Sequence, residues 1–138
     1  MTQAVAIFCE DIREEASGQV TLVGVFADNL EVPAVPGLMP KLCLYVRVHL
    51  DIGHKPSRIT SVLTDIDGSE IPLGGMEGGG LDSAFEEAES FGVPYVGVIL
   101  RGIFSPFRVN ATGRAVALVR VDDEEVACGS INFVLPKS

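Results

Sequence analysis

The chain has 138 residues, of which ten are lysine or arginine and nineteen are aspartate or glutamate, so the net charge is −9. This charge repels phosphate groups, and no basic cluster reverses it locally, so we expect no nucleic-acid binding and no attachment to an anionic membrane. The length fits one domain over residues 1–138. Hydrophobic residues make up 47% of the chain, and with the fifteen glycines they exceed the roughly 45–50% of ordinary domains, which favours strands buried on both faces or a subunit interface.

The cysteines and the chain start bear on the compartment. Cys9, Cys43 and Cys128 are odd in number and lie far apart, without a C-x-x-C or metal-binding spacing. Residues 1–10 lack the basic region of a signal peptide, and no stretch approaches the roughly 20 apolar residues of a membrane span. We therefore expect a cytoplasmic protein with reduced thiols that holds no metal and no other cofactor.

The first third of the chain predicts a hairpin followed by an irregular crossover. Residues 4–12 and 20–27 have strand patterns, and the short glycine-containing segment between them is typical of a hairpin turn. Prolines at 33, 36 and 40 follow. Because proline cannot donate to a strand ladder, residues 33–40 are predicted to be an irregular crossover.

Residues 41–52 form the clearest strand, because apolar and polar residues alternate there without interruption. The apolar side is Leu42, Leu44, Val46, Val48, Leu50 and Ile52. The other side contains a polar strand face of Tyr45, Arg47, His49 and Asp51. Such a strand covers a core with one face, and its polar face is directed to solvent, to a second subunit or to a binding site.

The middle of the chain contains a further strand and a glycine-rich stretch. Residues 58–66 are predicted as a strand that ends at an Asp-Gly turn, and residues 70–73 as a short strand. Five glycines within residues 74–80 predict a flexible loop. A phosphate-binding loop is not expected, since Gly80 is followed by Leu81-Asp82 instead of a lysine and a serine or threonine. Asp82 or Ser83 is expected to cap a short helix over residues 82–90.

The last third predicts three more strands and one short extended segment. Residues 93–104 are apolar on both alternating sets, 107–109 are short and extended, and 114–121 with 126–135 form a closing hairpin. No strand–helix alternation is present. The fold class predicted from these elements is all-β: a two-sheet antiparallel β-sandwich of about eight or nine strands with at most one short helix.

Several blocks of this sequence resemble a known family. They are Phe8-Cys9-Glu10-Asp11-Ile12-Arg13-Glu14-Glu15, Val20-Thr21-Leu22-Val23-Gly24-Val25-Phe26, Pro40-Lys41-Leu42-Cys43 and the hairpin at residues 121–126. They resemble a family of uncharacterised bacterial and bacteriophage proteins with an N-terminal F-C-x-D-I-R-E-E type block. The resemblance is clearest over residues 6–48 and 113–134. It implies a bacterial or phage origin and assigns no activity and no functional residue.

The candidate sites are few. His49 or His54 could act as a general base only beside a carboxylate and a nucleophile. The sequence pattern places no such set of residues together. The Asp65-Ile66-Asp67-Gly68 turn, with Glu70 and with Asp122 and Asp123 as further donors, is a fragment of a calcium-binding pattern. The carboxylates among residues 10–15 are read as a solvated group. We assign no catalytic, cofactor-binding or metal-binding residue.

The function predicted from the sequence is a non-enzymatic, self-associating binding or structural module. A small hydrolase, or a ligand- or calcium-binding protein with a site assembled across loops, is the alternative. In a two-sheet sandwich only one of the two apolar sets of residues 93–104 can face the shared core, so the other set needs a cover. We expect a second subunit, most simply in a two-fold dimer; a different protein partner is not identified.

Overall fold

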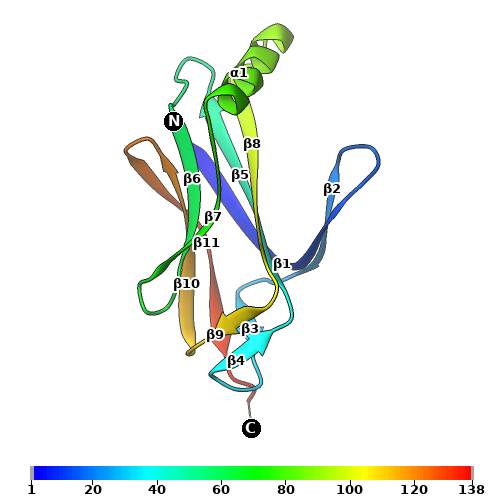
Figure 1. The fold of residues 1–138 in the computed structure, drawn as a ribbon, viewed down its shortest axis with the longest axis vertical. Helices are drawn as coiled ribbons and strands as arrows, with labels where there is room; N and C mark the ends of the chain where they lie inside the picture. The colour runs from blue at the N-terminus through cyan, green and yellow to red at the C-terminus, as the bar shows by residue number, and fades with distance from the viewer. Residues whose placement is uncertain (1, 138) are drawn as a thin grey trace.

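The computed structural model describes residues 2–137 and is mostly β, with one short helix (Figure 1). In chain order its elements are β1 (Gln3–Glu14), β2 (Val20–Val25), β3 (Asn29–Glu31), β4 (Gly37–Met39), β5 (Leu42–Asp51), β6 (Arg58–Thr64), β7 (Glu70–Glu77), α1 (Gly79–Phe91), β8 (Tyr95–Phe104), β9 (Phe107–Val109), β10 (Gly113–Val121) and β11 (Glu124–Val134). The mostly β class and the short helix are confirmed. The described region has eleven strands, so the expected eight or nine are too few.

The strands form three sheets instead of the expected two. The four-stranded sheet has the order β2-β1-β5-β8, the five-stranded sheet β3-β11-β10-β6-β7, and the third consists of β4 and β9. The strand pairs are antiparallel except β11 and β3, which run parallel.

The two additional strands are β3, just before the proline segment predicted to be irregular, and β4, within that segment. Residues 29–31 pair with the end of β11, and residues 37–39 pair with β9. The prolines at 33, 36 and 40 lie outside both strands. Proline excludes a ladder only at its own position, so β4 fits between Pro36 and Pro40. Neither three-residue strand has a sequence pattern that would identify it.

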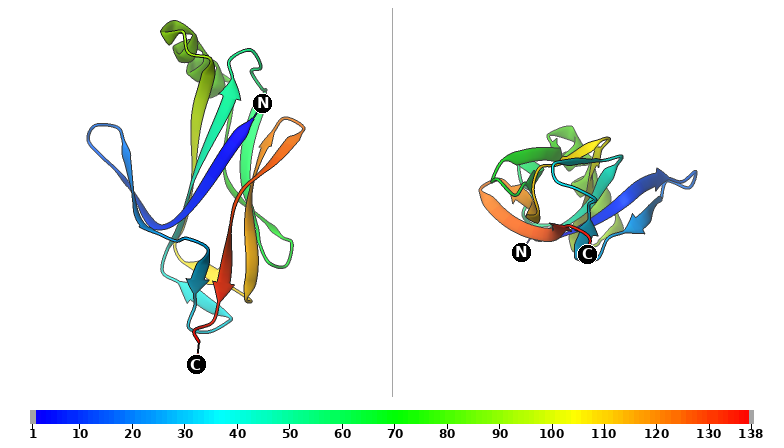
Figure 2. Two further views of the ribbon diagram at one scale, coloured as in Figure 1. Left: turned by 180° about the vertical axis from the view of Figure 1, so that it is seen from behind. Right: turned by 90° about the horizontal axis from the view of Figure 1, so that it is seen from below.

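Strand β1 changes partner halfway along its length. Residues 3–9 pair with β5, whereas residues 9–14 pair with β2. Beyond Cys9 the β1–β2 hairpin therefore continues as two strands without β5 and projects from the body of the molecule (Figure 2). We call residues 10–25 the hairpin arm. A two-stranded hairpin is marginally stable in isolation, so the arm depends on what its sides contact.

One buried cluster draws on both larger sheets. The predicted apolar side of β5 is buried from Leu42 to Leu50, at 0–2% exposure. It faces buried residues of β6, β10 and β11, among them Leu63, Ala117 and Phe133. Each fully buried Leu, Val or Phe side chain contributes about 1.5–3 kcal/mol relative to an exposed one. This cluster therefore supplies the main favourable term of folding.

The glycine-rich stretch is not a loop, which corrects the prediction for residues 74–80. Gly74 and Gly75 belong to β7, and Gly79 and Gly80 open α1. A Cβ on Gly75 would lie 3.0 Å from the carbonyl oxygen of Ile59, so close strand packing and not chain flexibility explains this glycine. Only Gly78 lies between the strand and the helix, with a φ of 56° that favours glycine.

The helix starts earlier than predicted. It begins at Gly79, and no side chain caps it, so the expected caps Asp82 and Ser83 lie inside it. Leu81, Phe85 and Ala88 are buried against the core. Leu81 is buried because the helix already includes it, one position before Asp82. A capping signal at Asp82 or Ser83 cannot indicate this earlier start. This thirteen-residue helix is not long and apolar enough to cross a membrane, and the part of the chain described here has no other helix.

Candidate functional site

The outward face of the four-stranded sheet is the candidate site, and β5 runs along its middle. Strand alternation places Tyr45, Arg47, His49 and Asp51 on this face, as the sequence predicted. Arg47 is exposed and the other three are half-buried. Their partial burial means that neighbouring strands contribute side chains to the same face.

Strand register identifies those neighbours. Arg47 lies between Val5 of β1 and Ile99 of β8, and Tyr45 lies between Ile7 and Arg101. His49 lies between Gln3 and Gly97, and Asp51 lies opposite Tyr95. We call this surface the open face; its members are Gln3, Val5, Ile7, Tyr45, Arg47, His49, Asp51, Tyr95, Gly97, Ile99, Arg101 and Ile103. The face is thus a polar strand between two apolar strands.

The apolar members of the open face are unusually accessible. Val5 is 57% exposed, Tyr95 58%, Ile99 47% and Ile103 54%. By contrast Val96, Val98 and Leu100, the alternate residues of β8, are at most 5% exposed. The structure therefore decides which apolar set of residues 93–104 faces the core, and it leaves the other set exposed at the surface of the described chain.

Two shallow cavities hollow the open face around His49. One of about 330 Å³ is lined by Gln3, Ala4, Val5, Ile7, Tyr45, Arg47 and His49. The other, of about 270 Å³, is lined by Gln3, His49, Asp51 and Tyr95. Gly97 lies beside the imidazole, and a Cβ there would make an ordinary contact with Cδ2 of His49 at 3.8 Å. Larger residues at 97 would fill the depression.

The hairpin arm reaches the open face at one point. Nη1 of Arg101 donates to Oε1 of Glu14 at 2.5 Å, which joins the arm to β8. Both side chains are exposed, so the pair stabilises the arm by at most about 1 kcal/mol. This contact orients the arm beside the open face without covering the apolar side chains.

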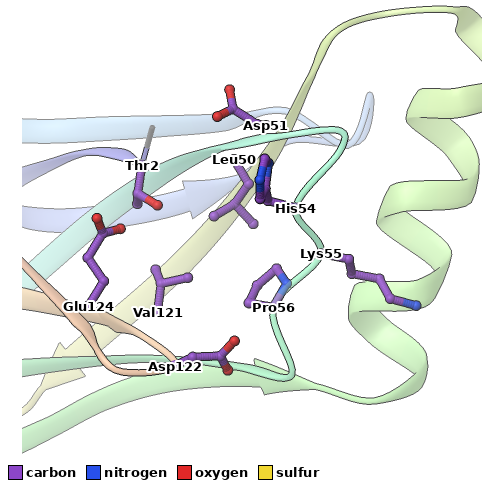
Figure 3. Close-up of a pocket in the computed structure, with 9 residues that line it drawn as sticks. All are labelled: Thr2, Leu50, Asp51, His54, Lys55, Pro56, Val121, Asp122 and Glu124. Atoms are coloured by element: carbon purple, nitrogen blue, oxygen red, sulfur yellow. The ribbon is translucent and has the colours of Figure 1, made fainter.

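A further cavity of about 400 Å³ lies where β5 ends and β10 turns into β11 (Figure 3). It is lined by Thr2, Leu50, Asp51, His54, Lys55, Pro56, Val121, Asp122 and Glu124. Figure 3 shows His54 across the cavity from Asp122 and Glu124, with Lys55 directed away toward the helix, where it pairs with Asp82.

The polar groups of this cavity serve mainly structural purposes. The Asp122 carboxylate accepts from the backbone N–H groups of Ser57 at 3.0 Å and Arg58 at 3.1 Å, which ties the start of β6 to the β10–β11 turn. The hydrogen bonds between side chains of residues 2–137 include none made by either imidazole. A general base needs such an orienting contact and a nucleophile within reach. His49 and His54 are thus not brought into a catalytic arrangement.

The Asp-Gly turn that suggested calcium binding uses its carboxylates internally. Oδ1 of Asp65 accepts from the N–H of Ile66 at 2.8 Å, and Oδ1 of Asp67 accepts from the N–H and the hydroxyl of Ser69 at 2.9 and 2.6 Å. The bonds from Ser69 lower the pKa of Asp67. Within residues 2–137 no group of three or more Asp, Glu, His or Cys side chains is arranged to hold a metal ion.

Sequence reasoning missed one pair of cysteines. Cys9 and Cys43 lie directly opposite each other on β1 and β5 and are fully buried. Burial, with a smaller effect of the neighbouring Cys43 thiol, raises the pKa of Cys9 to about 11. Because the thiolate is the reactive form, these thiols are poor nucleophiles at neutral pH. Only strand register could have shown that the two residues meet.

Together these features define a mostly β protein with one short helix and an exposed sheet face on which apolar strands flank a polar one. The chain belongs to a family of unknown function (DUF6941), whose family model matches residues 4–134. This match agrees with the resemblance to a family of unknown function, and it assigns no residue a role. No curated protein and no solved structure matches the chain.

Proposed function

We propose that this protein is a non-enzymatic binding or structural module that self-associates through the open face. The observation that carries the proposal is the row Val5–Arg47–Ile99, in which two exposed apolar side chains flank an exposed arginine. Soluble monomers rarely expose contiguous apolar patches without a binding role. Interfaces are enriched in tyrosine and arginine, and both tyrosines of the chain belong to the open face.

The occupant we propose is a second copy of the chain. The pattern is nearly symmetric about β5, since β1 and β8 are apolar on either side of it. A two-fold axis through the sheet can therefore place the apolar strands of one copy on those of the other, as an isologous interface requires. The middle of the face holds Arg47 and Arg101 instead of the acidic residues that dominate the chain. The arginines of two copies would repel each other if they met, so the proposed axis must offset Arg47 of one copy from Arg47 of the other.

Other features of the proposal are less specific to the open face. We infer that the two larger sheets pack as a β-sandwich, because one buried cluster draws on both. A cytoplasmic location is supported by the free cysteines Cys9, Cys43 and Cys128. The resemblance of the N-terminal block to bacterial and bacteriophage proteins supports a bacterial or phage origin. A hydrolase using His54 has less support than self-association, because the imidazole lacks an orienting partner and a placed nucleophile.

Multi-angle light scattering with size exclusion tests self-association at micromolar concentration. We expect a dimer mass for the wild type and a monomer mass for Val5→Asp, which places a charge in the apolar row. Leu135→Asp is the matched control, because Leu135 is 47% exposed and lies outside the open face; it should remain dimeric. A monomeric wild type, or dissociation by the control alone, would refute the proposal.

A further inference from the structure

We propose a second binding site, distinct from the open face, that takes an extended peptide segment of a partner protein with apolar side chains and a lysine or arginine. The site is a cavity of about 610 Å³ between the hairpin arm and the segment that carries β3 and β4. In Figure 1 that segment lies below the arm. We call it the arm cleft; it is lined by Glu10, Asp11, Val23, Phe26, Leu30, Glu31, Val32, Pro33, Leu38, Met39, Pro40 and Lys41.

The floor and the rim of the arm cleft are apolar. Leu30 and Val32 are buried at 4% and 3% exposure, whereas Leu38 on β4 is 63% exposed. Phe26 and Met39 are half-buried between these levels. An apolar floor with an exposed apolar rim favours a ligand that extends over the rim, since a small molecule inside the cavity would leave Leu38 in water.

The charges of the arm cleft favour a cation. Lys41 donates to Asp11 at 2.6 Å, and this bond lowers the pKa of the Asp11 carboxyl, so the two groups neutralise each other. The carboxylates of Glu10 and Glu31 have no ion pair or side-chain hydrogen bond within residues 2–137. Two carboxylates beside an apolar surface complement a lysine or arginine that is flanked by apolar residues.

The sequence provides space for one of these carboxylates. Gly24 of β2 has a φ of +66°, and a Cβ there would lie 2.7 Å from Cδ of Glu10. The Glu10 side chain therefore lies across the arm, over the glycine opposite it. A strand interior disfavours glycine, and its presence is explained by the left-handed φ, which leaves room for the acidic side chain.

The wall of the arm cleft that β4 forms is held in place before any ligand binds. Pairing of Gly37–Met39 with β9 fixes β4, and Phe107 of β9 stacks on Phe133 at 5.8 Å between ring centroids. A preformed wall reduces the ordering entropy that binding would otherwise require. An extended peptide fits such a wall because alternate side chains can enter the cleft while the others remain in solvent.

Fluorescence anisotropy with a labelled heptapeptide tests this proposal. Positions 1, 3, 5 and 7 of the probe are lysine, leucine, valine and lysine, with threonine between them; the control peptide has glutamate in place of lysine. We expect saturable binding of the lysine peptide only. Glu10→Gln and Glu31→Gln should each weaken it roughly tenfold, as expected when one charge-assisted hydrogen bond is lost.

Matched variants separate this site from the open face. Glu124→Gln removes an exposed carboxylate away from the arm cleft and should leave peptide affinity unchanged, as should Val5→Asp. Leu38→Asp should abolish binding while circular dichroism shows an unchanged fold. Equal binding of the glutamate peptide, absence of binding at millimolar probe, or complete competition by hexylammonium would overturn the proposal, the last by indicating a small-molecule site. Failure of self-association with intact peptide binding would refute only the open-face proposal.

Discussion

Two adjacent residues of β8 allow the two faces of the sheet to be tested by the same substitution. Val98 is 2% exposed and faces the core, and Ile99 is 47% exposed on the open face. Val98→Asp loses about 1.5–3 kcal/mol of apolar burial and places a carboxylate in the core, which adds several kcal/mol more. The sum is comparable with the whole free energy of unfolding of an ordinary domain, about 5–15 kcal/mol.

The assay is urea unfolding followed by circular dichroism, with light scattering on the same samples. Val98→Asp should be largely unfolded without denaturant. Ile99→Asp should remain folded, because the Ile99 side chain is already half in water, and it should dissociate the proposed dimer. A folded Val98→Asp protein with a wild-type midpoint would refute the assignment of faces. Unfolding by both substitutions would instead show that β8 is core on both sides within one subunit.

Three further predictions concern packing and titration. Gly129→Ala should lower the free energy of unfolding by about 1–3 kcal/mol, because its Cβ would lie 2.9 Å from the carbonyl oxygen of Ala6, whereas Gly53→Ala, with open space around it, should not destabilise; urea midpoints decide this. Iodoacetamide at pH 8 should alkylate native Cys9 far more slowly than the urea-unfolded chain, because burial holds the pKa of this thiol near 11; equal rates would contradict the burial. The pKa of Asp11 lies below its ordinary 3.8, so its pair with Lys41 stabilises the fold above that pH, and the contribution is lost as pH falls through the lower folded value. Asp11→Asn should therefore show a weaker loss of stability on acidification, and an unchanged acid profile would argue against the pair.

The sequence by itself determined the elements that depend on local pattern. Uninterrupted alternation fixed β5 and the two faces of its side chains, because period-two placement is a property of the extended backbone alone. The hairpin signals at both ends of the chain, with their turn residues, likewise predicted β1–β2 and β10–β11. The apolar residues of β8 predicted that only one of its two side-chain sets can face the core. Because both sets are equally apolar, the sequence could not indicate which set faces the core and which is exposed.

Tertiary structure decided everything that depends on neighbours distant in the chain. Strand register places Cys9 opposite Cys43. It also places Val5 and Ile99 on either side of Arg47, so the sheet face combines the polar side chains of β5 with apolar side chains of β1 and β8. Gly75 belongs to a strand in which a Cβ would crowd the backbone of Ile59, whereas Gly79 has open space around it and begins the helix. A glycine required for close packing has the same sequence signature as one in a flexible loop. The arm cleft joins segments whose proximity comes from the change of partner along β1, and no local pattern encodes that change.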